Sequence, residues 1–443
     1  MRHPERVAAI ATAPRFDVHA RVTRVIGQII EATSLPVGVG EVCRVEHDEH
    51  HAILTQVVGF HERGILLMPL GELQGVSPGA VVIPFGRGFY AKVGDGLIGR
   101  VLDGLGRPAD GRPLAGLFAQ RALTAEPPAA LQRPRIRRPL GTGVRAIDGL
   151  LTLGLGQRIG ILAGSGVGKS VLLGMIARGT TADVNVNALL GERGREVREF
   201  IERDLGPEGL ARSVVVMATS DRSAVVRATG GLVATAIAEY FRDTGRNVLL
   251  MMDSVTRVAM AWREIGLAVG EPPTTKGYPP SVFAALPRLL ERAGTARTGS
   301  ITGLYTVLVE GDDFNEPVAD AARSILDGHI VLSRRLASAK HFPAIDVLES
   351  VSRVRDQVVD AAFLDASDRV LRLEAAYRAH EDLISVGAYK PGADPLVDTA
   401  IALRPEVQAF LRQVAGEQAG VPETRERVRQ LAARAAGQTN GGP

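Results

Sequence analysis

Short runs of apolar residues alternate with polar ones between Arg21 and Phe89. Turn-forming residues separate four such runs, which begin at Val22, Ala52, Gly64 and Ala80. Short strands at this spacing are typical of a small all-β barrel. We therefore predict a β-barrel domain over residues 21–92 and a flexible N-terminus over residues 1–20.

Farther along the chain the apolar runs lengthen and alternate with stretches of helical periodicity. The predicted strands cover residues 159–163, 184–191, 213–219, 247–253, 302–310 and 329–333. The predicted helices between them include residues 171–178, 195–205 and 224–243. Uninterrupted apolar strands with helices between them indicate a mostly parallel sheet that is covered on both faces. We predict an α/β domain over residues 93–370, with ligands beyond the carboxyl ends of the strands.

Glycine becomes rarer from about Leu371, and helical periodicity dominates the rest of the chain. Three helices are predicted, over residues 375–383, 395–414 and 424–436. We predict a small helical domain over residues 371–436, followed by a disordered tail over residues 437–443.

The composition excludes several classes of protein. With 52 basic and 49 acidic residues, the net charge of +3 gives no argument for binding nucleic acid or a membrane. The single cysteine, Cys43, excludes an internal disulfide and is typical of a reducing cytosol. The chain has no run of about 18 apolar residues that could span a membrane. Its N-terminal apolar stretch is too short for a signal peptide.

Three local features have ordinary structural explanations. The segment Glu46–His51 is rich in histidine and acid, but its spacing matches no zinc pattern, so we expect a solvated hairpin tip. The basic run Arg133–Arg138 could bind an acidic partner, but its prolines favour a semi-rigid surface linker. Asn187 interrupts an otherwise apolar strand, and we expect it to face a polar partner.

Residues 159–170 combine an apolar strand, a glycine-rich turn and the start of a helix. This order predicts a phosphate-binding loop rather than a plain turn, with alanine at the usual first glycine. Glycines let the backbone wrap around phosphate oxygens, and the helix N-terminus adds a positive dipole end. Lys169 should reach the β- and γ-phosphates, and the Ser170 hydroxyl should bind Mg²⁺. The expected nucleotide-binding residues are Gly164, Ser165, Gly166, Val167, Gly168, Lys169 and Ser170.

Three residues far from this loop are candidates for the chemistry. Asp253 ends an apolar strand, where a carboxylate can hold Mg²⁺ beside the phosphates, although it could instead cap a helix. Glu192 follows another strand and could polarise the attacking water, but a surface acid is about equally compatible with the pattern. Arg353 could stabilise charge on the γ-phosphate of a neighbouring subunit or form a structural ion pair, and spacing alone does not decide.

Further motifs accompany these residues. They are Gly191-Glu-Arg-Gly-Arg-Glu-Val-Arg-Glu-Phe, Asp253-Ser-Val-Thr-Arg-Val-Ala-Met-Ala, Glu271-Pro-Pro-Thr-Thr-Lys-Gly-Tyr-Pro-Pro-Ser-Val-Phe, Asp312-Asp-Phe-Asn-Glu-Pro-Val-Ala-Asp and Pro343-Ala-Ile-Asp-Val-Leu-Glu-Ser-Val-Ser. With the phosphate loop, they make the chain resemble the rotary-type hexameric ATPases over about residues 20–435. The branch of type III secretion and flagellar export ATPases is the more similar one.

The resemblance assigns roles to individual residues. It implies that Glu192 is the catalytic glutamate, that Arg193 lies near the γ-phosphate and that Asp253 is associated with Mg²⁺. It implies that Arg353 is an arginine finger donated across a subunit interface and that Phe342 packs on adenine. It also implies an N-terminal β-barrel, a central RecA-like ATPase domain, a C-terminal helical domain and a homohexamer.

The function implied is an ATP-hydrolysing motor of a protein export apparatus, with ATP and Mg²⁺ as cofactors. It would release export substrates from their chaperones and assist their unfolding. The implied location is the cytosolic face of the inner membrane, beside the export gate and the stator and stalk proteins. Whether the apparatus is flagellar or a host-directed injectisome is left open by the sequence.

Three other functions are weighed against this one. A catalytic subunit of a rotary ion-translocating complex is the main alternative. The sequence of residues Pro272–Pro280 disfavours this alternative. A ring that translocates RNA would need aromatic platforms in the barrel, where Phe60 and Phe85 are the only phenylalanines before Phe89, so no nucleic acid is expected. A non-catalytic ring subunit would lack the carboxylate that Glu192 supplies.

Overall fold

The computed structural model describes residues 18–46, 52–116, 118–309 and 316–439, and the chain forms two compact units. The first comprises the described residues up to Phe89 together with Ala268–Glu271, and the second comprises the rest. The predicted N-terminal tail, the histidine-containing segment 47–51 and residues 312–315 lie outside the described residues, apart from residues 18–20 of the tail.

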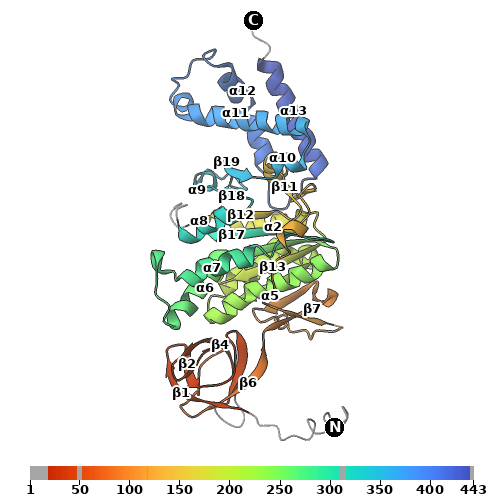
Figure 1. Cartoon of the computed structure of the whole chain (residues 1–443). Helices are drawn as coiled ribbons and strands as arrows, with labels where there is room; N and C mark the ends of the chain where they lie inside the picture. Colours follow the sequence, from red (N-terminus) through yellow and green to blue (C-terminus); the bar gives the residue numbers. More distant parts are fainter. Residues whose placement is uncertain (1–17, 47–51, 117, 310–315, 440–443) are drawn as a thin grey trace. The chain divides into compact units, whose positions relative to one another are not determined.

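The first unit is a closed barrel of six antiparallel strands (Figure 1), as the alternating pattern predicted. Its strand order is β1-β2-β5-β4-β3-β6, with bounds β1 (Ala20–Ile26), β2 (Ile29–Thr33), β3 (Glu41–Glu46), β4 (Ala52–His61), β5 (Gly64–Pro69) and β6 (Val81–Gly88). Alternate side chains point inward, so Ile30, Val45 and Leu67 share one buried cluster. Gly64 is required, because a Cβ there would lie 1.8 Å from the carbonyl oxygen of Ala32.

The second unit is built on a nine-stranded sheet in the order β19-β18-β12-β17-β15-β13-β14-β8, with β16 paired to β17. All pairs from β18 to β8 along this order are parallel, whereas β19 and β16 pair antiparallel. The bounds are β8 (Arg100–Asp103), β12 (Arg158–Ala163), β13 (Val184–Leu190), β14 (Ser213–Ala218), β15 (Asn247–Asp253), β16 (Gly294–Thr295), β17 (Ser300–Leu308), β18 (Gly328–Leu332) and β19 (Ile345–Ser352). The predicted, mostly parallel sheet is confirmed.

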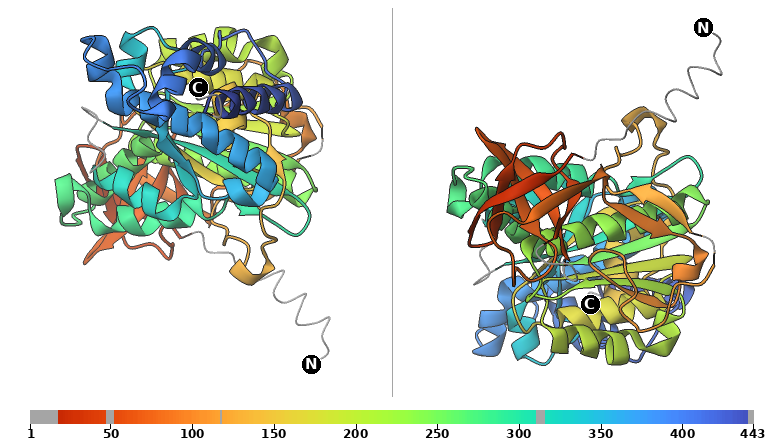
Figure 2. Two further views of the ribbon diagram at one scale, coloured as in Figure 1. Left: turned by 90° about the horizontal axis from the view of Figure 1, so that it is seen from above. Right: turned by 90° about the horizontal axis from the view of Figure 1, so that it is seen from below.

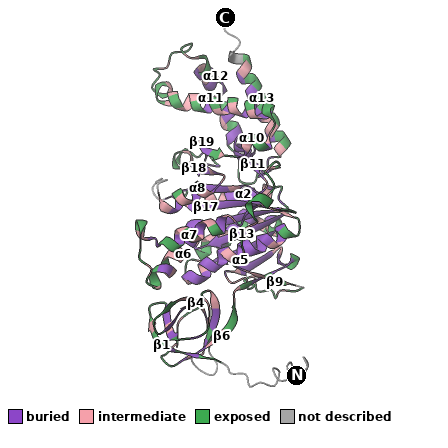
Figure 3. Ribbon diagram, in the orientation of Figure 1, coloured by how far each residue is buried: buried purple, intermediate pink, exposed green. Residues whose placement is uncertain are grey.

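The central strands of this sheet are buried along almost their whole length (Figure 3), because helices cover both faces (Figure 2). One covering helix, α5, packs against β13, β14 and β15. Among the described residues, the α-helices before the C-terminal region are α2 (Lys169–Gly179), α3 (Gly194–Glu199), α4 (Gly206–Leu210), α5 (Ala224–Asp243), α6 (Val255–Ala268), α7 (Pro280–Leu290), α8 (Pro317–Ile325), α9 (Arg334–Ser338) and α10 (Arg355–Val358).

Shorter elements connect this framework. The helix predicted over residues 195–205 is divided, because α3 ends at Glu199 and continues as the π-helix η4 (Phe200–Leu205). The other short helices are η1 (Asp95–Leu97), η2 (Ala130–Gln132), the π-helix η3 (Ile147–Leu151) and η5 (Thr275–Gly277). Two small sheets pair β7 (Tyr90–Val93) with β9 (Ala119–Ala122) and β10 (Pro139–Leu140) with β11 (Leu153–Gly154).

Asn187 on β13 lies between apolar neighbours and is 1% exposed. Neither its Oδ1 nor its Nδ2 has a hydrogen-bond partner among the described residues. The expectation that this side chain faces a polar partner is therefore wrong for the part of the chain that the structure describes.

Three helices form the C-terminal region and pack on one another: α11 (Ala361–Ser385), α12 (Pro395–Leu411) and α13 (Val421–Thr439). Phe363, Leu403 and Val428 are buried among them. The domain limits given above remain a prediction; residue 371 lies within α11, and α13 extends past residue 437. None of the helices formed by the described residues is long and apolar enough to cross a membrane.

Candidate active site

The predicted phosphate loop connects β12 to α2, as the order of strand, turn and helix implied. Gly166 and Gly168 adopt left-handed backbone conformations, with φ of 78° and 87°, which glycine adopts without strain. Gly168 is the residue before α2, so no side chain caps the first backbone N–H groups of this helix. Those groups are left available to an anion at the positive end of the helix.

The ammonium group of Lys169 lies between two carboxylates. Its Nζ is 2.5 Å from Oδ1 of Asp253 and 3.3 Å from Oε1 of Glu192, and all three side chains are largely buried. Burial by itself lowers the pKa of Lys169, but the two carboxylates outweigh it and raise the pKa above the ordinary value. Lysine therefore stays charged in this site.

Asp253 is held from the neighbouring strand. It is the last residue of β15, and Thr306 on β17 donates a 2.6 Å hydrogen bond to the same Oδ1 that contacts Lys169. The carboxylate is thus fixed by a hydroxyl on one side and by an ammonium group on the other. No pattern in the sequence pointed to Thr306, because threonine is an ordinary residue within a strand.

Glu192 follows β13 after a sharp turn at Gly191, which has φ of 74°. A Cβ on Gly191 would lie 2.8 Å from the Cβ of Arg257, so the turn requires glycine. Burial raises the pKa of Glu192, and a hydrogen bond with Glu196 and the charge of Asp253 act in the same direction, against Lys169. The site thus contains a buried carboxyl that holds its proton unusually tightly.

A cavity of about 660 Å³ opens over these residues. It is lined by Gly164, Ser165, Gly166, Gly168, Lys169 and Ser170 from the loop, and by Glu192 and Arg193. Val167 is not in this lining, and its side chain is 2% exposed in the core, which leaves only its backbone to face a ligand. The Arg193 side chain is mostly exposed and forms an ion pair with Glu196.

Two arginines that the sequence analysis did not assign also line this cavity, Arg257 on α6 and Arg334 on α9. The Nε of Arg257 is buried without a hydrogen-bond partner among the described residues. A signal for Arg257 was present, because it lies in the first turn of the helix that follows the strand ending at Asp253. An orphaned guanidinium donor beside the loop suits a phosphate ligand.

Phe342 and Arg353 lie outside this cavity. Phe342 is 41% exposed and lines a neighbouring hollow of about 660 Å³ with Gly166, Gly168 and Pro343. A Cβ on Gly168 would lie 3.4 Å from the Phe342 ring, so the ring is adjacent to the phosphate loop. Arg353 follows the end of β19, is exposed and lines neither hollow.

The residues present fit Mg²⁺ with a nucleotide. Lys169, Asp253 and Glu192 carry a net negative charge when all are ionised, and the oxygens of Asp253 and Ser170 are the hard donors that Mg²⁺ prefers. Phosphate oxygens would in turn meet Lys169, Arg257 and the N-terminus of α2.

Comparison with known proteins identifies the family. Residues 22–86 match the β-barrel domain of the ATP synthase alpha/beta family, residues 143–352 match its nucleotide-binding domain, and residues 359–430 match the T3SS EscN ATPase C-terminal domain. The chain is 53% identical to the flagellum-specific ATP synthase of Bacillus subtilis over 96% of this chain and 97% of that protein. It is 52% identical to the type 3 secretion system ATPase of Xanthomonas euvesicatoria over 92% of each chain.

Solved structures agree with this assignment. The assembled ATPase EscN of the enteropathogenic E. coli type III secretion system superposes with a TM-score of 0.88, at 47% identity over 93% of this chain and all of that chain. EscN in complex with its central stalk EscO superposes with a TM-score of 0.87 at the same identity and coverage. The chain therefore belongs to the family of type III secretion and flagellar export ATPases, and it is an ATP-hydrolysing enzyme.

Proposed function

We propose that this chain is the hexameric ATPase motor of a type III protein export apparatus, and that it releases and unfolds chaperone-bound export substrates. The proposal of ATP hydrolysis at this site is supported by the contact of Lys169 with both Asp253 and Glu192 beside the phosphate loop. Asp253 ends β15, Glu192 follows the neighbouring strand β13, and Lys169 opens the helix that follows β12, so all three lie at the carboxyl edge of one sheet, where a nucleotide would meet them.

Each residue has a proposed role in hydrolysis. Lys169 and the N–H groups of Gly164, Ser165, Gly166, Val167, Gly168 and Ser170 bind the β- and γ-phosphates. Ser170 and Asp253 would hold Mg²⁺, which would supply positive charge against the charge that develops on the phosphate oxygens.

Glu192, when ionised, accepts a hydrogen bond from the attacking water and orients it. Arg193 lies near the γ-phosphate, and the ring of Phe342 packs on adenine at the other end of the nucleotide.

Arg353 is proposed to serve the nucleotide of the neighbouring subunit. Its side chain is exposed and is outside the lining of its own phosphate-loop cavity, which supports an action in trans. The relative EscN is known as an assembled ATPase, and we propose a homohexamer for this chain. A guanidinium group supplied across the interface would stabilise charge on the transferred phosphoryl group.

The proposed partners follow from the same likeness. EscN has been solved with its central stalk EscO, so we propose a central-stalk protein as a partner of this chain. Stator proteins, the export gate and secretion chaperones with their substrates complete the proposal. The proposed location is cytoplasmic, at the cytosolic face of the inner membrane, and no nucleic acid is involved. A catalytic subunit of a rotary ion-translocating complex is disfavoured by the match of residues 359–430 to the EscN C-terminal domain.

A mixing experiment tests the trans arrangement. Arg353→Ala should lower kcat by roughly 10³–10⁵-fold while ATP still binds, because only the transition-state charge loses its partner. Glu192→Gln should also bind ATP without turning it over. Rings assembled from both variants should recover activity, since a Glu192→Gln subunit still offers Arg353 to its neighbour.

Arg335→Ala is the matched control, because Arg335 is an exposed arginine that pairs with Glu381. It should leave turnover unchanged. Wild-type turnover per subunit should rise with protein concentration as rings form. Turnover that is independent of concentration, together with an unimpaired Arg353→Ala variant, would overturn the proposal.

A further inference from the structure

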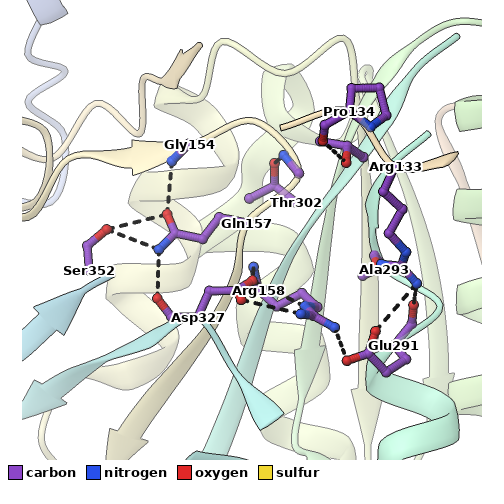
Figure 4. A network of polar contacts seen from close by, with 12 residues as sticks. Arg133, Pro134, Gly154, Gln157, Arg158, Glu291, Ala293, Thr302, Asp327 and Ser352 are labelled. Carbon is purple, nitrogen blue, oxygen red and sulfur yellow. Dashed lines mark hydrogen bonds and ion pairs between the residues drawn. The ribbon is translucent and has the colours of Figure 1, made fainter. Parts of the chain in front are cut away.

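A buried glutamine connects the end of β11, the residue before β18 and the end of β19 (Figure 4). Gln157 immediately precedes β12 and is 0% exposed. Its Nε2 donates to the carbonyl oxygen of Asp327 at 3.1 Å and to Oγ of Ser352 at 3.0 Å. Its Oε1 accepts from the backbone N–H of Gly154 at 2.9 Å. Ser352 directly precedes Arg353 in the chain, so the glutamine side chain is bonded to the hydroxyl group next to the residue that carries the exposed guanidinium group.

Asp327 fixes the same backbone from a second direction. Its carbonyl oxygen, which accepts from Gln157, also accepts from the N–H of Arg353 at 3.0 Å. Its carboxylate accepts from the backbone N–H of Arg158 at 3.0 Å and from the Arg158 guanidinium group at 3.2 and 3.3 Å. The start of β12 therefore binds the segment before β18, and that segment binds Arg353.

The basic run found in the sequence supports this network rather than forming only a surface linker. Arg133 donates to the backbone carbonyls of Glu291 at 2.5 Å and Ala293 at 3.0 Å. The carboxylate of Glu291 in turn forms ion pairs with Arg133 and with Arg158 (Figure 4). The guanidinium group of Arg158 is thus held between the carboxylates of Asp327 and Glu291.

Strand pairing leaves little space for this segment to shift. Gly328 of β18 pairs with Ser352 of β19, and a Cβ on Gly328 would lie 2.1 Å from the carbonyl oxygen of Val351. The close approach fixes the backbone before Arg353, while the Arg353 side chain itself stays exposed. A side chain that binds a ligand outside its own protomer needs a backbone held in a defined position.

β12 connects this network to the nucleotide site. The strand begins at Arg158 and ends at Ala163, where the phosphate loop starts, and it pairs with β17 along its whole length and with β18 from Gly160 to Ala163. One continuous strand therefore has the protomer's own phosphate loop at its end and, at its start, the residues that hold the backbone of Arg353.

We infer that Gln157 is a positioning residue for Arg353: it holds the backbone from which the protomer presents this guanidinium group to the nucleotide of its neighbour. The inference rests on the proposed action of Arg353 in trans. Positioning matters because a displacement of about 1 Å in a catalytic group can cost roughly 10²-fold in rate.

The test uses full-length Gln157→Leu, which places an apolar side chain of similar size there and removes the hydrogen bonds of the amide to Gly154, Asp327 and Ser352. The expected result is a kcat lowered by roughly 10²-fold with KM for ATP little changed, because the protomer's own phosphate loop is intact. Mixing then separates a positioning role from general damage. Gln157→Leu mixed with Glu192→Gln should recover turnover, since about one quarter of the interfaces then pair an intact Glu192 with a properly held Arg353. Gln157→Leu mixed with Arg353→Ala should show no recovery above the turnover of Gln157→Leu alone.

Two serines of β19 provide a milder variant and its control, should Gln157→Leu fail to fold. Ser352→Ala removes the hydroxyl that Gln157 contacts, and it should lower kcat with the same mixing pattern. Ser350→Ala removes a buried hydroxyl that bonds Val331 and Asp346 instead, and it should keep turnover.

The outcomes separate the inference from the proposed function. Recovery of Gln157→Leu with Arg353→Ala but not with Glu192→Gln would overturn the inference, because the defect would then lie in the protomer's own site. Equal losses in Ser352→Ala and Ser350→Ala would also overturn it. Failure of Arg353→Ala to recover with Glu192→Gln would instead refute the trans arrangement itself.

Discussion

Nζ of Lys169 lies 2.5 Å from Oδ1 of Asp253, so a residue proposed to bind phosphate and a residue proposed to hold Mg²⁺ are directly paired. Each satisfies the charge of the other within a largely buried site, and Glu192 is close to the same ammonium group. In the proposed mechanism, binding of Mg²⁺ and a nucleotide would exchange this pairing for contacts of Lys169 with phosphate and of Asp253 with the metal. The free enzyme would thus be stabilised by the same groups that are proposed to bind the ligand.

Lys169→Ala should destabilise the protein and abolish nucleotide binding. Removing one partner of a buried ion pair leaves uncompensated charge, which typically costs about 3–5 kcal/mol. Here two carboxylates, Asp253 and Glu192, would be left without their cation. Urea unfolding and ATP titration measure the two effects. The double variant Lys169→Ala with Asp253→Asn is the control: it should regain part of the stability but none of the binding. Equal stability of the single variant and the wild type would contradict the pairing.

The raised pKa of Glu192 predicts how stability depends on pH. Because the folded protein holds this proton more tightly than the unfolded chain, where the ordinary pKa is 4.5, wild-type stability falls as pH rises through the raised pKa. Glu192→Gln cannot lose that proton. Its stability relative to wild type should therefore increase from below pH 4.5 upward and level off once Glu192 is ionised. Urea unfolding at a series of pH values measures the difference, and a decrease with rising pH would contradict the assignment.

The same shift predicts the acid limb of the activity. In the proposed mechanism Glu192 must be ionised to orient the attacking water, so kcat/KM for ATP, which reports the pKa of the free enzyme, should fall with decreasing pH while the pH is still above 4.5. Initial rates at saturating Mg²⁺ and at ATP concentrations well below KM measure this limb. A rate that stays constant down to pH 4.5 would show that Glu192 is not the titrating base.

Much of the fold followed from the pattern of apolar residues. Three strands were predictable from this pattern: the strand before the phosphate loop, the strand before Glu192 and the strand that ends at Asp253. The grouping of these residues was predictable as well, because the carboxyl ends of parallel strands meet at one edge of the sheet. Thr306 and Gln157 were not, because their partners are distant in sequence and neither residue type signals a site. The start of α11 at Ala361 was missed, since this helix packs on both α12 and α13 and has no simple polar face.

Phe342 should contribute to the affinity for the adenine base and not to the affinity for the phosphates. Base stacking on an aromatic ring is worth about 1–3 kcal/mol when measured by alanine substitution. Phe342→Ala should raise the Kd for ATP accordingly, and Phe342→Tyr should keep it, because the ring is retained. Binding of inorganic tripolyphosphate is the control, since it has no base and should be equal in all three proteins. Weaker tripolyphosphate binding by Phe342→Ala would mean that the ring supports the adjacent Gly168 instead.

Asn187→Leu should stabilise the protein. Both polar atoms of Asn187 are buried without hydrogen-bond partners among the described residues, and an unsatisfied buried polar group costs about 1–3 kcal/mol. Asn185 on the same strand is the matched control: it is equally buried, but its Nδ2 donates a 2.8 Å hydrogen bond to the carbonyl of Ala177. Asn185→Leu should therefore destabilise, because it orphans that carbonyl. Thermal unfolding of the two variants decides the matter. If Asn187→Leu instead lowers Tm as much as Asn185→Leu does, the Asn187 amide has a partner, and the strand before Glu192 is held by a polar contact rather than by apolar packing alone.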